Sequence, residues 1–386
     1  MAINSTTDPR YAHIIGWGMA VPDRVLSNDD LSAIVDTSDD WIQERTGIRE
    51  RRIAAEDEST ATLGFLAARR ALKVANILPT DIDMVIVATS TPENIFPSTA
   101  SLIQDSLGAT SAGAFDLSAA CTGFIYGLDI ATNAILAGSI KTALVIGSET
   151  MSRLINWEDR GTCILFGDGA GAVILQARPT PGGILSSILR SDGSGRDLLT
   201  APTVGSRDAH IPEAGLAADS VVMHRMTMNG REVFRFASRV IRESVLEALE
   251  KADCTIEAVD WVIPHQANAR IISRAAKSLN IPEDKFIVNI EQYGNTSAAS
   301  IPIALCEAIE QDRIKANDTL VFVGFGAGLA WGATVITWGV TEPVEQSYLN
   351  EMRRELAYRV ARQRSRLTRT LRRVEGWRQD TPLDDL

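Results

Sequence analysis

Short apolar runs alternate with longer amphipathic stretches along most of this chain. A run of about four to eight apolar residues is typical of a buried strand, and apolar positions recurring every three or four residues are typical of a helix. Strands are predicted at Met84–Ala88, Ala143–Gly147, Ala170–Leu175, Trp261–Pro264, Phe286–Ile290, Leu320–Phe325 and Ala333–Trp338. Helices are predicted at Thr60–Ala75, Thr122–Ala137, Arg231–Lys251, Ala269–Leu279 and Ser300–Gln311. This alternation indicates an α/β protein with buried, largely parallel sheets.

The order of elements repeats within the chain. One series runs from the strand at Met84 through a turn of small residues at Cys121, and a second runs from the strand at Trp261 through a turn at Asn295. Each contains two helices and ends in another apolar strand, and the offset is about 176 residues. We therefore expect two similar halves, with Cys121 and Asn295 at equivalent strand-to-helix junctions. Such junctions are where α/β sheets place ligands.

Composition is that of a folded, globular chain, with 386 residues of which 45% are hydrophobic and 23% charged. The repeat divides it into halves at residues 1–180 and 181–340, followed by a tail at 341–386.

Residues Leu320–Val340 carry no charge and are long enough to cross a bilayer. Five glycines interrupt this segment. It is therefore interpreted as two buried strands joined by a glycine-rich bend, and no transmembrane segment is predicted.

Charge and cysteine content narrow the function classes. A net charge of -11 argues against nucleic acid as a partner. The four cysteines stand singly, which indicates neither a disulfide framework nor a zinc site, and no metal is predicted. The first residues lack a signal-peptide pattern, so a cytoplasmic location is expected. Three cysteines are interpreted as packing residues and three histidines have no partner at metal-ligand spacing: Cys163, Cys254, Cys306, His13, His210 and His224.

Three residues have the chemistry and the placement expected of a catalytic site. Cys121 follows small residues and precedes an apolar helix, where the positive end of the helix dipole is expected to lower the thiol pKa. His265 ends a strand, and Asn295 lies in a glycine-led turn before a helix. Taken singly, they are better explained as a buried thiol, a core histidine and a helix N-cap. Their common position at one sheet edge favours catalysis.

Short motifs in this chain resemble β-ketoacyl-acyl-carrier-protein synthase III, the initiating condensing enzyme of bacterial fatty acid synthesis. The segments that carry the resemblance are Ser118–Gly123, Phe166–Gly171, His265–Arg270, Gly294–Ser300 and Gly324–Gly328, with Asp40–Ile42, Arg45–Arg51, Phe96–Ser98 and Asp159–Thr162 in support. The family implies a thiolase-like fold, a five-layered αβαβα duplication. It also implies a homodimer without a cofactor, which condenses a short acyl-CoA, with acetyl-CoA as the expected primer, and malonyl-acyl carrier protein to 3-oxoacyl-carrier protein.

Roles for single residues follow from the same resemblance. The implied catalytic residues are Cys121, His265 and Asn295, with the backbone N–H groups of Cys121 and Ala327 as the oxyanion hole. Coenzyme A would be held by Trp41, Arg45, Arg160, Asn268 and Arg270. The carrier protein would meet Gln266, Ala267, Asn268, Ala269 and Arg270. Phe96 would bound the acyl pocket of a neighbouring subunit. Many relatives have a third glycine where this chain has Ala327, which matters only if that position needs a positive φ.

Other functions share some of these features. Papain-like proteases have the same chain order of Cys, His and Asn, but they lack the internal duplication, and their Cys-Trp signature is absent here. Starter-unit polyketide, quinolone and hydroxymethylglutaryl-type synthases are nearer alternatives. A non-catalytic carrier-protein-binding partner would keep the fold and lose the nucleophile, whereas Cys121, His265 and Asn295 are all present.

The tail lies outside the resemblance. Between Glu351 and Arg378 it has ten arginines and three glutamates. Apolar residues recur at about 3.6-residue spacing and predict one helix with an apolar stripe: Leu349, Met352, Leu356, Val360, Leu367, Leu371, Val374 and Trp377. Either this stripe docks on the acidic body or on another subunit's tail, or the tail is a basic arm that binds acidic carrier protein or an anionic membrane surface.

Overall fold

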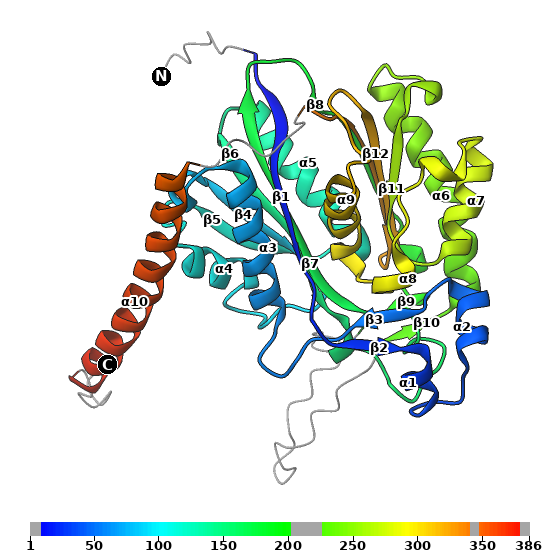
Figure 1. Ribbon diagram of the computed structural model, residues 1–386, viewed down its shortest axis with the longest axis horizontal. Helices are drawn as coiled ribbons and strands as arrows, with labels where there is room; N and C mark the ends of the chain where they lie inside the picture. The colour runs from blue at the N-terminus through cyan, green and yellow to red at the C-terminus, as the bar shows by residue number, and fades with distance from the viewer. Residues whose placement is uncertain (1–8, 202–225, 340–346, 379–386) are drawn as a thin grey trace.

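Two β-sheets stacked on a pair of central helices form the body of the protein (Figure 1). The computed structural model describes residues 9–201, 226–339 and 347–378, with side chains as far as residue 371. The first sheet has the strand order β1-β7-β6-β4-β5, and the second has the order β11-β12-β13-β8. Their strands are β1 (Tyr11–Ala20), β4 (Met84–Ala88), β5 (Gly113–Leu117), β6 (Thr142–Thr150), β7 (Asp168–Arg178), β8 (Gly183–Ser191), β11 (Trp261–Pro264), β12 (Thr319–Gly326) and β13 (Ala330–Thr337).

The two sheets repeat one topology. In the first, β4 runs parallel to β6, β7 pairs antiparallel with β6, and β1 pairs antiparallel with β7. In the second, β11 runs parallel to β12, while β13 and then β8 pair antiparallel in the same order. Corresponding strands therefore occupy corresponding places, which confirms the predicted duplication.

Five layers result. Helices α3 and α4 cover the outer face of the first sheet, α5 and α9 lie between the sheets, and α6 and α7 cover the outer face of the second. The largest apolar core joins α5 and α9 to the inner faces of both sheets. The layered fold predicted from the resemblance is confirmed. The helices are α3 (Thr60–Ala75), α4 (Thr99–Leu107), α5 (Gly123–Leu136), α6 (Gly230–Lys251), α7 (Ala269–Leu279) and α9 (Ser300–Glu310).

Smaller elements cap the end of the body that carries the active site. Helix α2 packs against α7, where Gly47 at the end of α2 lies against Ala269. No helix within the described residues is long and apolar enough to cross a membrane. The uncharged segment from Leu320 instead forms β12 and β13, as predicted. The remaining short elements are α1 (Asn28–Ser32), α2 (Asp39–Thr46), α8 (Ile290–Tyr293), β2 (Val25–Ser27), β3 (Glu50–Arg52), β9 (Leu199–Thr200) and β10 (Thr227–Met228).

The predicted strand at Phe286–Ile290 is wrong. This segment makes one bridge, between Phe286 and Val262, and Ile290 already begins α8. The cause lies in a side chain, because the Gln266 amide oxygen accepts the Asn289 N–H at 3.1 Å. The Gln266 side chain thus makes a hydrogen bond to this segment that a neighbouring strand would otherwise make.

The tail forms the predicted helix, α10 (Tyr348–Arg378), but it docks through a different face from the predicted one. Its buried side chains are Arg354, Tyr358 and Ala361, which face α3 and α4. Ion pairs of α10 with Arg69, Lys73 and Asp105 of the body support the contact, and Arg354 donates to Asn76. The stripe from Leu349 to Leu371 points away and is exposed. The side chains of Val374 and Trp377 lie outside the described part.

Candidate active site

A cavity of about 720 Å³ opens between α2, α6 and α7 and reaches inward to the junction of the two halves. Cys121, His265 and Asn295 all line it. Cys121 comes from the short helix η2 (Ala120–Thr122) before α5, His265 follows β11, and Asn295 precedes η8 (Ser297–Ala299) and α9. The tertiary structure therefore brings together the three residues that the sequence singled out.

The backbone around Cys121 is held in an unusual conformation. Ala120 has a φ of 45°, in the left-handed region that non-glycine residues rarely adopt. The equivalent position in the second half is Ser297, with a φ of 50°, so Cys121 itself corresponds to Ala298 rather than to Asn295. Gly326 of β12 lies so close that a Cβ there would be 2.9 Å from the Cys121 nitrogen. Glycine at this position lets β12 contact the nucleophile's backbone.

Burial dominates the ionisation of Cys121. The thiol is 7% exposed, and desolvation raises its pKa to about 12, although a hydrogen bond with the Ser297 side chain acts in the opposite direction. The predicted lowering of this pKa by the helix terminus is therefore wrong for the resting site. Desolvation disfavours the thiolate more than the hydrogen bonds favour it. Burial therefore favours the thiol form of Cys121.

His265 lines the same cavity as Cys121. Its Nδ1 lies 2.7 Å from Ser300 Oγ, and its ring packs edge-on against Phe325 with centroids 5.3 Å apart. Burial lowers the imidazole pKa to about 3, so His265 is neutral at physiological pH. Because Nδ1 is engaged with Ser300, Nε2 is the ring nitrogen left for the reaction.

Asn295 is oriented by its own turn. Its side-chain oxygen accepts the Ser297 N–H at 2.8 Å, which leaves the Nδ2 amide hydrogens as donors. Its backbone N–H donates to Leu165 O at 2.8 Å, and its backbone oxygen accepts from Gly167 N–H at 3.1 Å. These bonds tie the turn to the first half of the chain. The site thus offers one thiol, one neutral imidazole and one amide donor.

The cavity mouth is basic and has an aromatic centre. The guanidinium carbon of Arg45 lies 4.6 Å from the centroid of the Trp41 ring. That of Arg160, which is not among the residues lining the cavity, lies 5.2 Å from the same ring. Arg270 lies on α7 at the opposite rim, 5.9 Å from the Phe234 ring centroid. Three further lining arginines were not predicted from the sequence: Arg231, Arg235 and Arg274. Only the fold shows that they share the mouth, which suits an anionic ligand.

Comparison with known proteins identifies the family. Family models named 3-oxoacyl-[acyl-carrier-protein] synthase III and its C-terminal part match residues 115–193 and 249–338. The β-ketoacyl-[acyl-carrier-protein] synthase III of Symbiobacterium thermophilum is 50% identical over 330 residues, which cover 86% of this chain and 99% of that protein. The chain belongs to the β-ketoacyl-[acyl-carrier-protein] synthase III family.

Solved structures agree. The family member from Aquifex aeolicus is 48% identical with a TM-score of 0.78 and covers 85% of this chain and 100% of its own. A priming β-ketosynthase from the R1128 polyketide pathway is 35% identical with a TM-score of 0.81, covering 89% of this chain and 99% of its own. The C-terminal family model ends at residue 338, so α10 lies beyond it.

The structure gives information on two positions that the family resemblance singled out, Ala327 and Phe96. Ala327 is not among the residues with positive φ, so alanine here brings no backbone strain. Phe96 does not line this chain's own cavity and is 84% exposed. No group of three metal-binding side chains occurs within the described ranges.

The segment expected to face a carrier protein divides into buried and exposed parts. Gln266 is buried, and its Nε2 donates to Pro264 O at 2.7 Å and to Ile287 O at 3.1 Å. The prediction that Gln266 faces a partner is therefore wrong for its side chain. Asn268 caps α7 and donates to Arg45 O at 2.9 Å, which joins α7 to α2. Ala267 and Ala269 are half-buried, and Arg270 is exposed.

Sequence reasoning missed a buried carboxyl group beneath the nucleophile. Glu149, at the end of β6, accepts the Thr91 hydroxyl at 2.6 Å and the Ser90 N–H at 3.0 Å, and it also reaches the Ala298 N–H at 3.5 Å. Burial raises its pKa, and a hydrogen bond with the Ser297 side chain opposes that rise. Because Ser297 also bonds Cys121, one hydroxyl connects the thiol with this carboxyl group. A charged residue ending a strand, next to small polar residues, is the sequence signal that could have pointed to it.

The low pKa of His265 predicts a specific dependence of stability on pH. The unfolded chain takes up this proton near pH 6.5, whereas the folded chain does so near pH 3, so stability falls as pH falls between these values. A His265→Gln variant lacks this pH-dependent contribution to stability. We expect the unfolding free energy of the unmodified protein to fall more steeply below pH 6.5, by about 1.4 kcal/mol per pH unit. Urea unfolding at several pH values measures this, and parallel curves would contradict it.

Proposed function

We propose that this protein catalyses the decarboxylative condensation of a short acyl-CoA with malonyl-acyl carrier protein to 3-oxoacyl-carrier protein, which initiates fatty acid synthesis. The observation that carries the proposal is the single cavity in which Cys121, His265 and Asn295 meet behind a mouth lined by arginines. The 50% identity to a β-ketoacyl-[acyl-carrier-protein] synthase III over nearly its full length supports the same reaction.

Acyl transfer comes first. The thiol of Cys121 gives its proton to Nε2 of His265 while the sulfur attacks the thioester carbon of acyl-CoA. The backbone N–H groups of Cys121 and Ala327 are the candidate donors to the developing oxyanion. Collapse of the tetrahedral intermediate breaks the bond to the CoA sulfur, which leaves as a thiol with the proton returned by His265. The acyl group is then held as a thioester of Cys121, and His265 is neutral again.

Condensation needs hydrogen-bond donors rather than a base. Malonyl-carrier protein loses carbon dioxide, and the electron pair of the broken bond forms an enolate at the thioester. His265 Nε2–H and Asn295 Nδ2–H donate to the enolate oxygen. The carbanion attacks the acyl-Cys121 carbonyl carbon and expels the Cys121 thiolate, which takes up one proton from solvent water. No proton has to be removed from carbon, so the neutral imidazole favoured by burial suits this step.

Ser300 can support His265 in both half-reactions. As a base, His265 needs a bare Nε2, with Nδ1–H donating to Ser300 Oγ. As a donor, it needs Nε2–H, with the Ser300 hydroxyl donating to Nδ1. A hydroxyl both donates and accepts, so Ser300 can bond either tautomer. The change of tautomer between the two half-reactions also moves one proton from Nδ1 to solvent and one proton from solvent to Nε2. We infer that Ser300 is a positioning residue for the imidazole.

The residues at the cavity mouth can bind coenzyme A and the acyl carrier protein, the two molecules that carry acyl groups to the site. We propose that Trp41, Arg45 and Arg160 hold the nucleotide of coenzyme A and that Asn268 supports this site by positioning Arg45. Arg270 meets the acidic carrier protein, beside the half-buried Ala267 and Ala269. The exposure of Phe96 is consistent with a homodimer in which it bounds the partner's acyl pocket.

Priming of a polyketide is the second candidate function, favoured by the TM-score of 0.81 to a priming β-ketosynthase. That relative is 35% identical, against 52% for the β-ketoacyl-[acyl-carrier-protein] synthase III of Desulfitobacterium hafniense, which covers 84% of this chain and 97% of its own. The chemistry of the two reactions is the same. Identity therefore favours fatty acid initiation.

Covalent labelling tests the nucleophile. Incubation with radiolabelled acetyl-CoA should place one acetyl group on Cys121, because this thiol alone among the four lines the cavity with His265. Cys121→Ala should remove the label and abolish condensation, while the buried control Cys163→Ala should keep the label. Peptide mass mapping reads the site, and a label that persists in Cys121→Ala would overturn the assignment.

Separate assays of the half-reactions test His265 and Asn295. Asn295→Ala should lower malonyl-carrier decarboxylation by about 10²–10³, because one donor to the enolate is lost, and should leave acetyl transfer to Cys121 nearly unchanged. His265→Ala should slow both steps, since His265 serves as base and donor. Ser300→Ala should slow both less than His265→Ala. Equal losses in both steps for Asn295→Ala would contradict its role as an enolate donor.

Charge reversal tests the carrier-protein contact. Arg270→Glu should raise the KM for malonyl-carrier protein at least about tenfold, with little change for a malonyl-pantetheine mimic that lacks the protein. The salt dependence of the KM should become flatter. Arg242→Glu, a surface arginine of α6 outside the cavity, is the matched control. Similar losses with both substrates would show that Arg270 is structural.

A further inference from the structure

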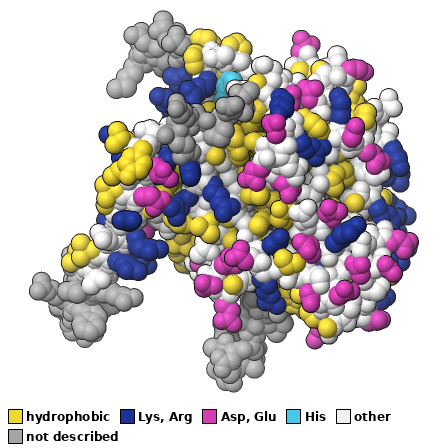
Figure 2. Space-filling view, in the orientation of Figure 1, with side chains coloured by type: hydrophobic (Ala, Val, Ile, Leu, Met, Phe, Trp, Pro, Cys, Tyr) yellow, Lys and Arg dark blue, Asp and Glu magenta, His cyan; other side chains and the backbone are white. Residues whose placement is uncertain are grey.

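Helix α10 has an apolar face that the body of the protein leaves uncovered. Leu349, Met352, Leu356, Val360, Leu367 and Leu371 are each at least half exposed. Their spacing of three, four or seven residues puts them on one side of the helix, opposite the buried Tyr358 and Ala361. Figure 2 shows hydrophobic and basic side chains along α10 at the left edge of the molecule. These residues form an aligned apolar stripe, interrupted at Gln363, rather than scattered exposed residues.

Arginines border this stripe on both sides. Arg359 and Arg366 flank it on one side and Arg353 and Arg364 on the other; all four are exposed, and Arg364 also pairs with Asp105 of the body. The two acidic residues of α10 whose side chains are described, Glu351 and Glu355, instead pair with Lys73 and Arg69 of the body. The face turned outward is therefore apolar in the middle and positive along both edges.

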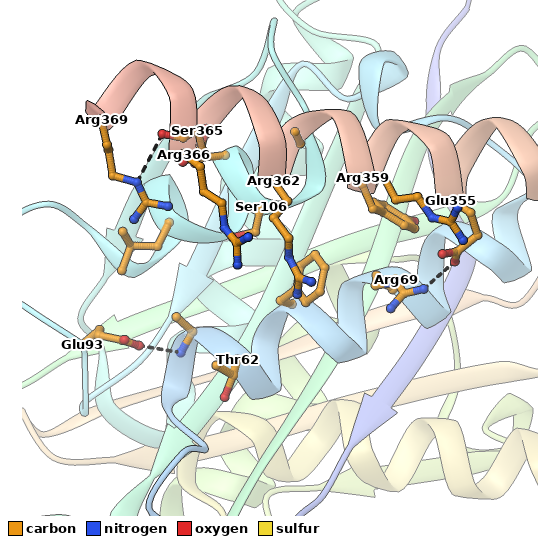
Figure 3. Close-up of a pocket in the computed structure, with 16 residues that line it drawn as sticks. Thr62, Arg69, Glu93, Ser106, Glu355, Arg359, Arg362, Ser365, Arg366 and Arg369 are labelled. Atoms are coloured by element: carbon orange, nitrogen blue, oxygen red, sulfur yellow. Dashed lines mark hydrogen bonds and ion pairs between the residues drawn. The ribbon is translucent and has the colours of Figure 1, made fainter. Parts of the chain in front are cut away.

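A groove of about 730 Å³ runs between α10 and helices α3 and α4. Figure 3 shows Arg359, Arg362 and Arg366 extending from α10 over this groove. None of these three side chains makes a hydrogen bond or ion pair with any residue that the structure describes.

The acidic residues of the groove, in contrast, are all engaged. Glu355 pairs with Arg69, Asp105 with Arg364, and Glu93 accepts from Ser59 Oγ at 2.6 Å. The groove therefore offers guanidinium groups that have no partner among the described residues, and each can donate two hydrogen bonds to two oxygens of a phosphate.

We propose that α10 binds the surface of an anionic lipid bilayer, with the apolar stripe at the boundary of headgroups and acyl chains and the arginines on lipid phosphates. An amphipathic helix that combines an apolar face with basic edges binds such surfaces through both terms. Docking of Arg354 and Tyr358 on the body holds the helix with its stripe outward, so the ordering cost of forming it is already met.

Two other occupants fit the observations less well. A second copy of α10 would bring arginines of both helices together, because each edge of the stripe is basic, and like charges repel. A carrier protein bound to α10 would sit at the end of the molecule opposite α2 and α7, which hold the mouth of the active site (Figure 1).

Co-sedimentation of the full-length protein with lipid vesicles tests the proposal. The protein should bind vesicles of phosphatidylcholine with phosphatidylglycerol much more tightly than phosphatidylcholine alone, and high salt should weaken the binding. Leu356→Glu with Leu367→Glu, or Arg359→Glu with Arg366→Glu, should each weaken it by about tenfold or more. Matched controls are Leu136→Glu and Arg178→Glu, exposed residues away from α10, which should bind normally.

Each outcome either supports membrane binding by α10 or overturns it. Melting temperatures close to that of the unmodified protein would show that α10 variants keep the fold, and acetyl transfer to Cys121 should be unchanged in all of them. Absence of binding to anionic vesicles, or binding that the stripe variants do not reduce, overturns the proposal. A change of oligomeric mass without vesicle binding would assign the stripe to a second copy, and a raised KM for malonyl-carrier protein without vesicle binding would assign it to the carrier. The vesicle assay needs no substrate, so its failure leaves the condensing activity untouched.

Discussion

The contact between the amino-terminal ends of α5 and α9 decides where the reactive groups lie. Gly326 of β12 meets the backbone of Cys121, and Gly147 of β6 meets the backbone of Ala298. A side chain at either glycine would overlap backbone atoms and push the halves apart. Because Gly147 belongs to the first sheet and Gly326 to the second, each sheet contacts the strand-to-helix junction of the other half. The cavity that holds Cys121, His265 and Asn295 follows from this contact.

The same contact sets the protonation states. Closing the halves removes water from Cys121 and His265, so the neutral thiol and the neutral imidazole are both favoured. A helix terminus near a cysteine is not sufficient for a thiolate when desolvation is this complete. The hydroxyls of Ser297 and Ser300 connect these groups to both halves.

The fold was largely predictable from the sequence because its central strands are buried on both faces. Such strands appear as apolar runs, and the repeat of runs and helices indicated two equivalent sheets. The prediction failed at Phe286–Ile290, where the Gln266 side chain replaces a strand's hydrogen bonds. It also failed for the docking of α10, because Tyr358 and Ala361 fit against α3 and α4 through shape and ion pairs rather than through the longest apolar stripe.

The sequence by itself determined the residue types of the site, its motifs and their order, and thereby the family. Tertiary structure alone decided which of the predicted residues share a surface. It buried Gln266, left Arg270 exposed, added Arg231 and Arg274 to the mouth, and placed Glu149 under Cys121. It also reversed the expected pKa of the thiol. The physical reason is that a motif records local backbone geometry and side-chain chemistry, whereas burial, desolvation and contact between distant segments exist only after the two halves have packed together.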